Sequence, residues 1–143
     1  MKAVFLAATI ASFALLAAPQ TTKEIKKIPV TPTRADSGMQ MYKTYCASCH
    51  GLDGKGHGPA AEALKVAPAN LTALRRSNDG KFPSAKLSHI LEGADVTAHG
   101  SSEMPVWGPI FRSLESSTAL TKLRIANVIK YDYYMFDDTI NFL

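Results

Sequence analysis

Apolar side chains near the end of the chain recur at the spacing of one helix face. The positions that follow this spacing are Ile125, Val128, Ile129, Tyr133 and Phe136. A period of 3.6 residues predicts an amphipathic α-helix. Asp132 falls in the same stripe, where an apolar residue is expected. Because no segment shows the convincing alternation of a strand, the predicted fold class is all-α.

Capping and helix-breaking residues delimit further helical segments. These segments are expected at about residues 37–46, 59–66 and 83–91. Asp36 or Ser37 can cap the first, because a short polar side chain accepts a bond from a free backbone N–H. Pro59 and Pro83 suit the first turns of the other two. Gly93 is expected to end the third segment.

The N-terminal part of the chain is expected to lie outside the helical domain. Residues 1–18 have the pattern of a signal peptide, with Lys2 followed by 16 uncharged, mostly apolar residues. A membrane-spanning helix needs roughly 20 such residues, so we expect cleavage near residue 18; an uncleaved membrane anchor is the alternative. Residues 19–36 contain three prolines and predict a flexible linker. The domain would then span residues 37–143.

The net charge of the chain is +4 with histidines neutral. No basic stripe interleaved with aromatic residues is present, so nucleic acid is not an expected partner. Mild basicity is compatible with docking on an acidic face of a partner protein. A cleaved leader would place the protein in the periplasm, or otherwise outside the cytoplasm of a bacterium; contact with a membrane is expected only if the leader is retained.

Both cysteines of the chain lie in the pentapeptide Cys46-Ala-Ser-Cys49-His50. Cys-x-x-Cys-His is the attachment motif of c-type haem. Two thiols at positions i and i+3 of a helix lie on one side, where both can add to the vinyl groups of one porphyrin. The histidine that follows offers a nitrogen to the iron. The motif therefore predicts one covalent haem c and His50 as an axial ligand.

Three other interpretations of this motif compete with haem attachment. A thioredoxin-like pair needs a βαβ context, which the surrounding pattern lacks. A zinc site needs about four ligands, and the remaining histidines, His57, His89 and His99, show no paired spacing. A structural disulfide would close only a tight local loop and would leave His50 unexplained.

Met104 lies between polar residues and Pro105, outside any apolar stripe. Its setting differs from that of a methionine that fills a core. Pro105 and Pro109 predict a stiff, non-helical loop, and such a loop could hold the thioether at a set distance from iron. His99, in the same loop, is the rival sixth ligand.

With these residues the chain resembles the class I c-type cytochromes, specifically small exported bacterial monohaem types, over about residues 37–136. The family's methionine loop is matched by residues 103–108. Gly38 and Tyr42 match a glycine and an aromatic residue eight and four positions before the first cysteine, and Val128 and Tyr131 match a pair in the last helix. The resemblance implies the cytochrome c fold, in which short helices and loops surround one covalent haem.

The resemblance also implies particular contacts. The first and last helices would cross closely at Gly38. The carbonyl of Pro59 would accept a hydrogen bond from the second ring nitrogen of His50, which would orient the ring and raise its basicity. Trp107, with Arg75 and Arg76, is a candidate for holding the haem propionates, a surface or packing role being the alternative. Asp132 departs from the family, which has an apolar residue there.

The expected function is the transfer of single electrons between redox proteins outside the cytoplasm, without enzymatic activity, through iron bound by His50 and Met104. Methionine ligation raises the reduction potential relative to two nitrogen ligands. One alternative is a peroxidase-like haem enzyme or a gas sensor, either of which needs a labile sixth ligand. The other is a cytochrome subunit of a larger dehydrogenase or oxidase.

Overall fold

The computed structural model describes residues 32–93, 104–115 and 117–136. Within these residues all regular secondary structure is helical, which confirms the all-α class. The α-helices are α1 (Gly38–Met41), α2 (Ala47–His50), α3 (Ser84–Glu92), α4 (Trp107–Leu114) and α5 (Thr118–Phe136). A π-helical turn, η1 (Tyr42–Cys46), joins α1 to α2. Short 3₁₀ turns are η2 (Ala61–Ala63), η3 (Leu71–Ala73) and η4 (Arg76–Asn78).

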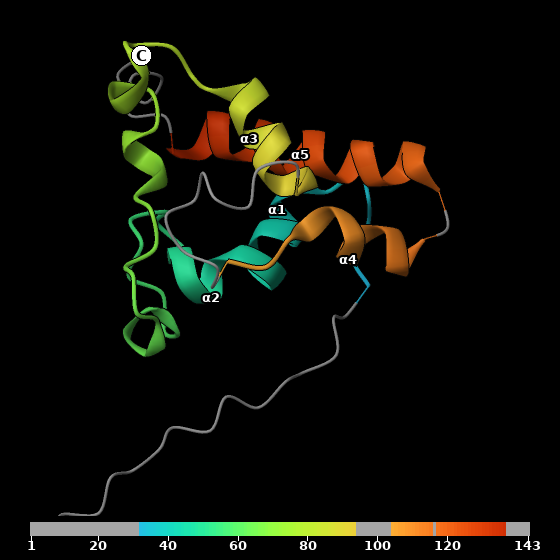
Figure 1. Cartoon of the computed structure of the whole chain (residues 1–143), viewed down its shortest axis with the longest axis horizontal. Helices are drawn as coiled ribbons and strands as arrows, with labels where there is room; N and C mark the ends of the chain where they lie inside the picture. The colour runs from blue at the N-terminus through green and yellow to red at the C-terminus, as the bar shows by residue number, and fades with distance from the viewer. Residues whose placement is uncertain (1–31, 94–103, 116, 137–143) are drawn as a thin grey trace, which may run out of the picture.

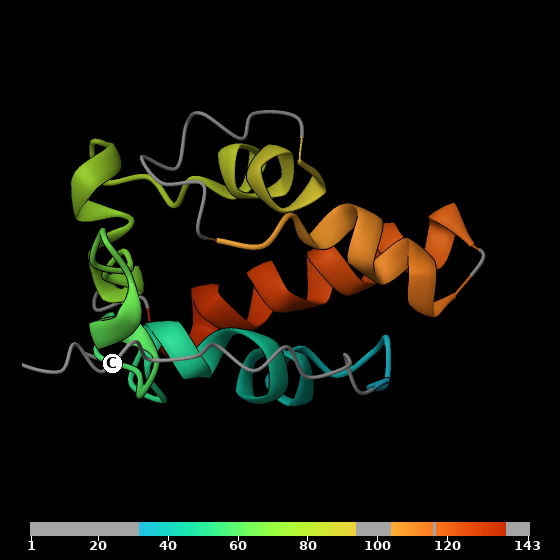
Figure 2. The same ribbon diagram turned by 60° about the horizontal axis from the view of Figure 1, so that its bottom comes forward.

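Helix α5 is the element around which the others are arranged. It packs against α1, α3 and α4, and Figure 2 shows it between the first helix and the α3–α4 pair. Residues 51–80, drawn in green, form a wall of turns at the C-terminal end of α5 (Figure 1). None of the helices in the described residues combines the length and the apolar character that crossing a membrane requires.

The first helix is longer than predicted, because α1, η1 and α2 run on from one another. Ser37 is its N-cap, since the Ser37 side chain accepts a bond from the backbone N–H of Gln40. In η1 the backbone N–H of Ala47 bonds the carbonyl of Tyr42, five residues earlier. Such a π turn is rare and is frequent at functional sites. Here it directly precedes the Cys46–His50 motif.

Helices α1 and α5 are in backbone contact at Gly38, as the resemblance implied. A Cβ atom placed on Gly38 would overlap the carbonyl oxygen of Asn127 and come within 2.9 Å of the Tyr131 Cβ. The Asn127 side chain also donates a hydrogen bond of 2.9 Å to the carbonyl of Ala35. The crossing therefore requires glycine at this position.

The predicted ends of α3 and the predicted stripe of α5 are confirmed. Gly93 has the left-handed φ of 88° and its N–H bonds the carbonyls of His89 and Ile90. The buried residues of α5 repeat every three or four positions and are Thr121, Arg124, Ile125, Val128, Ile129, Asp132 and Phe136. Tyr133 is instead half-buried and lies edge-on to Phe82.

Two local predictions were wrong. The segment after Pro59 is not a helix to residue 66: it contains only η2, and Leu64 is extended with a ψ of 146°. Further along, Pro68 disfavours a helical conformation for the residue before it. Pro109, placed in a non-helical loop, lies in the first turn of α4. A proline is tolerated there because the first backbone N–H groups of a helix have no intrahelical acceptor.

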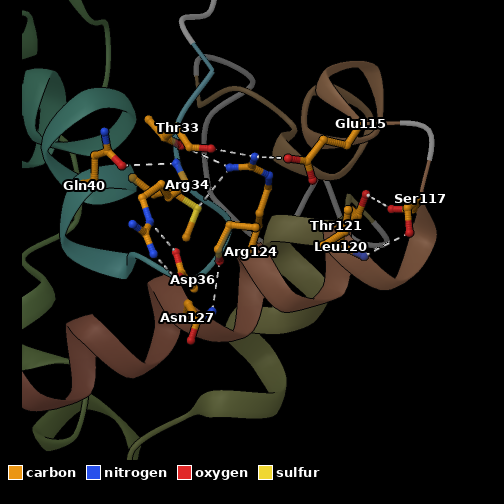
Figure 3. Close-up of polar contacts among 12 residues, drawn as sticks. Thr33, Arg34, Asp36, Gln40, Glu115, Ser117, Leu120, Thr121, Arg124 and Asn127 are labelled. Atoms are coloured by element: carbon orange, nitrogen blue, oxygen red, sulfur yellow. Dashed lines mark hydrogen bonds and ion pairs between the residues drawn. The ribbon is translucent and has the colours of Figure 1, made fainter.

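Residues 33–36, which the sequence assigned to the linker, pack on the domain (Figure 3). The carbonyl of Thr33 accepts a 2.7 Å bond from the buried Arg124 guanidinium. The Thr33 hydroxyl lies 2.9 Å from that of Tyr45. The packed domain therefore begins by Thr33 rather than at residue 37. The predicted signal peptide lies outside the described residues.

Candidate functional site

A cavity of about 290 Å³ opens between the first helix, residues 64–78, α3, the segment after residue 103 and α5. Its walls are largely aliphatic and include Leu64, Leu71, Leu74, Leu87, Ile90 and Val128. Leu64 reaches the cavity because the chain is extended where a helix had been predicted. Such a concave, mostly apolar site with a few polar groups is typical of a cofactor site.

Most of the predicted site residues meet in this cavity. Its lining includes Cys46, Cys49, His50, Met104 and Trp107. Both cysteines are free thiols rather than a disulfide. His57 and His89, the other histidines of the described residues, are not part of the lining. His99 lies outside the described residues.

The prediction that the carbonyl of Pro59 accepts a hydrogen bond from His50 is wrong. The His50 Nδ1 lies 3.0 Å from the carbonyl oxygen of Ala69, not of Pro59. Residues 58–60 instead run back along the end of α2, where the N–H groups of Gly58 and Ala60 bond the carbonyls of Cys49 and Ser48.

The carbonyl of Ala69 is brought to His50 by an extended segment. The backbone N–H of Leu71 bonds the carbonyl of Gly54 at 2.7 Å, which holds this segment against residues 51–56. The Asn70 side chain caps η3 by accepting a bond from the backbone N–H of Thr72. Sequence reasoning missed Ala69 because a backbone acceptor leaves no mark in the side-chain pattern.

This hydrogen bond determines which ring nitrogen of His50 is available. A carbonyl oxygen can only accept, so Nδ1 carries the hydrogen and Nε2 keeps its lone pair. Burial lowers the pKa of His50, which favours the neutral ring, while the bond to Ala69 acts in the opposite direction. A neutral ring with a free Nε2 is the form that binds a metal.

The segment that carries Met104 is held in place just beyond that residue. Trp107 is buried and stacks on Phe111, with ring centroids 5.5 Å apart. A Cβ on Gly108 would come within 2.5 Å of the carbonyl oxygen of Glu92, so α3 and α4 touch through their backbones there. Met104 packs against the same core as Trp107. Its thioether is therefore presented from an anchored segment.

Among the described residues, one carboxylate lines this largely apolar cavity. Asp132 is 7 % exposed, and its Oδ1 has no hydrogen-bond partner. Burial raises the pKa of Asp132 to about 7. Burial also raises the pKa of the Cys46 thiol, and the Asp132 carboxylate adds to that effect. Asp132 stood out in the sequence as a polar residue in an apolar stripe, but its position in the site required the structure.

Arg75 and Arg76, candidates for the propionates, are not part of the cavity lining, whereas Trp107 is. The Arg75 side chain bonds the carbonyl of Gly80 at 3.1 Å and lies over the ring of Tyr133. Of the three propionate candidates, therefore, only Trp107 lines the cavity in the described structure.

The groups at the cavity fit a covalently attached haem. Two unpaired thiols, an imidazole nitrogen with a free lone pair and a thioether all face one apolar space. Two thiols can form thioethers, and imidazole and thioether are the axial ligands of c-type cytochromes.

Comparison with protein families agrees with this chemistry. A family model described as cytochrome C oxidase, cbb3-type, subunit III matches residues 33–116, more than half of the chain. The chain therefore belongs to this family and is a class I c-type cytochrome, a haem-binding electron carrier with covalently attached haem c. The match begins at Thr33, a residue that packs on the domain. Neither the curated proteins nor the solved structures gave a match.

Proposed function

We propose that this cytochrome carries single electrons between redox proteins outside the cytoplasm, with its iron bound by His50 and Met104. The observation that supports this most directly is the orientation of His50. Its Nδ1 is engaged by the Ala69 carbonyl, which leaves Nε2 free beside the cavity that Met104 also lines. When bound, haem supplies an iron that alternates between the ferric and ferrous states.

Each residue of the site has a distinct part in this proposal. Cys46 and Cys49 attach the porphyrin through thioethers, so that it cannot dissociate. His50 binds iron through Nε2, and the Ala69 carbonyl orients the ring and raises its basicity. Met104 completes the coordination and raises the reduction potential relative to a second nitrogen ligand. Trp107 packs against one edge of the site.

Replacing Met104 tests the ligand assignment. Ferrous native protein is expected to bind carbon monoxide poorly, and the oxidised protein should show the weak red absorption band of a methionine–iron(III) bond. Met104→Ala should abolish the band, admit carbon monoxide readily and lower the potential. Met39→Ala is the matched control, because Met39 is 50 % exposed on the first helix; it should behave as native.

Two results would contradict the proposal. Rapid carbon monoxide binding by the native protein would favour an enzyme or a gas sensor with a labile sixth ligand. A native protein that lacks the red band, and whose carbon monoxide reactivity is unchanged in Met104→Ala, would show that another residue completes the coordination; His99→Ala would then test the rival histidine.

A second candidate is a cytochrome subunit of a larger oxidase, which the description of the matching family favours. The haem chemistry would be the same, but the partner would be bound stably rather than transiently. Native electrophoresis of membrane extracts from the source organism, stained for haem, distinguishes the two. A stable subunit should migrate with a large complex in the membrane extract, whereas an independent carrier without its leader should be found in the soluble fraction as a single chain smaller than the 15.4 kDa of the full sequence.

Export and haem attachment can be checked on one purified sample. We propose that residues 1–18 are removed and that one haem is bound through two thioethers. The intact mass under denaturing conditions should equal that of the shortened chain plus one haem. Haem that separates in acidic organic solvent would contradict covalent attachment, and a mass that includes the leader would show an uncleaved anchor.

A further inference from the structure

Asp132 is placed where its charge can respond to the haem. It lies on the buried stripe of α5, between the core residues Val128 and Ile129 on one side and Phe136 on the other. Asp132 lines the cavity, and its Oδ1 is buried without a hydrogen-bond partner. A buried carboxylate oxygen without a partner is costly, so an apolar residue would stabilise the fold more. The proposed iron ligands, His50 and Met104, leave the carboxyl group of Asp132 without a function.

Several other titratable groups of the described residues lie near Asp132. The titratable or charged side chains of the described residues that face it or share its cavity are Tyr42, Tyr45 and Cys46 from η1, Cys49 and His50 from α2, Lys86 from α3 and Tyr131 from α5 itself. The described residues of α4 and η3 contribute no titratable side chain to the cavity. Burial and the Asp132 charge raise the pKa of Tyr42 and of Tyr131, which keeps these two side chains neutral at ordinary pH.

We propose that Asp132 takes up a proton when the haem iron is reduced, so that this cytochrome transfers a proton together with its electron near neutral pH. The inference rests on the electron-carrier function proposed above. The reducing partner protein supplies one electron, which converts ferric to ferrous iron. Solvent supplies one proton, which converts the Asp132 carboxylate to the carboxylic acid. Oxidation releases both.

The direction in which the Asp132 pKa changes on reduction follows from the charge of the cofactor. Ferric haem has one more positive charge than ferrous haem, and a nearby positive charge favours an ionised carboxyl group. The Asp132 pKa is therefore lower in the oxidised protein than in the reduced protein. Burial raises the pKa of Asp132 from its ordinary 3.8 to about 7, so we expect the pH window between the oxidised-form and reduced-form values to lie near neutrality. Within it the reduction potential falls as pH rises, because the reduced form binds more protons.

The test is the midpoint potential of the haem-loaded protein between pH 5 and 9. In the native protein the slope should approach a tenfold change in the reduction equilibrium constant per pH unit, which is about 59 mV for one electron. Asp132→Asn keeps the shape of the side chain and should flatten the slope. Asp79→Asn makes the same change at an exposed position and should leave the slope as in native protein.

An independent readout is the infrared difference spectrum between reduced and oxidised protein. A carboxylic acid band should appear on reduction, shift in heavy water and be absent from Asp132→Asn. This measurement on native protein shows whether a carboxyl group is protonated on reduction, even if the variant fails to load haem. A native potential that does not change with pH, or a slope that persists in Asp132→Asn through other groups such as the haem propionates, would overturn the inference.

These outcomes are separate from those that test the ligands. Failure of the Met104 assignment would appear in carbon monoxide binding and in the red band. Failure of the Asp132 inference would appear only in the pH dependence and in the carboxyl band.

Discussion

At the scale of single residues, a buried cation joins distant parts of the chain. Arg124 is 1 % exposed, and its guanidinium donates 2.7 Å and 2.6 Å hydrogen bonds to the Thr33 carbonyl and to Glu115 (Figure 3). A second nitrogen reaches the Thr33 hydroxyl and the sulfur of Met41. Because a buried charge is stable only when paired, Glu115 is the counter-ion on which this arrangement depends.

Glu115→Gln is therefore expected to destabilise the protein. The amide keeps the shape of the side chain but leaves the Arg124 charge uncompensated. Breaking a fully buried pair costs about 3–5 kcal/mol; Glu115 is 31 % exposed, so solvent screening reduces the expected loss to about 2 kcal/mol. Chemical denaturation of the haem-loaded variant measures this loss.

The exposed pair of Arg34 and Asp36 offers the matched control. These side chains are also 2.7 Å apart, but they are 76 % and 61 % exposed. Asp36→Asn, the same isosteric change, should leave the denaturation midpoint unchanged, because exposed pairs contribute little to stability. If Glu115→Gln and Asp36→Asn changed the denaturation midpoint equally, the stabilising effect of Glu115 would not depend on the burial of Arg124.

At the scale of elements, the contact of the first helix with α5 determines where the site is built. The crossing at Gly38 brings α1 against α5, and the π turn that follows leads into the cysteine motif. The hydroxyl of Tyr42, within that turn, donates a 2.6 Å bond to the carbonyl of Gly51, at the end of α2. A shift of the crossing would therefore move both thiols and His50 relative to α5.

Gly38→Val is expected to destabilise the protein by about 3 kcal/mol, the upper part of the range for overpacking. The added side chain meets the backbone carbonyl of Asn127, which cannot move aside as a flexible side chain could. Thermal unfolding followed at the haem absorption band gives the loss. Lys43→Val is the control, since Lys43 is exposed on the same helix. A Gly38→Val variant as stable as the control would place the crossing elsewhere.

At the scale of the whole molecule, the core and the cofactor cavity share residues. Leu91, Trp107 and Val128 belong to the main core cluster and also line the cavity. Without haem these side chains face an empty or hydrated space. At roughly 24 cal/mol per Å³ of void, a cavity of about 290 Å³ corresponds to at most about 7 kcal/mol. This is comparable to the whole stability of a small domain.

The haem-free chain is accordingly expected to be largely unfolded. Expression without the haem-attachment machinery, or as the double variant Cys46→Ala and Cys49→Ala, should yield a circular dichroism spectrum with little helix. The haem-loaded native protein is the reference and should show the helical spectrum of the described structure. A haem-free chain with native helix content and a cooperative thermal transition would show that the core is sufficient without its cofactor.

Local patterns in the sequence determined the all-α class, the helix over α5, an N-cap at Asp36 or Ser37, the Gly93 cap and the Cys46–His50 motif. These features depend on residues a few positions apart, whose spacing along a helix is fixed by its geometry. The close crossing at Gly38 followed from the resemblance and is confirmed by the backbone contact. The assignment of Met104 as a ligand stays a prediction that its place at the cavity supports.

Only the tertiary structure decided which groups meet across the chain. The Ala69 carbonyl replaced Pro59 as the acceptor for His50, because the choice depends on the path of a loop and not on a side chain. Arg124 and Thr33, 91 positions apart, met only through packing. The burial of Asp132 in the cavity wall likewise arose when α5 packed against distant segments. Long-range packing and backbone acceptors leave no periodic signal, and therefore the sequence alone could not predict them.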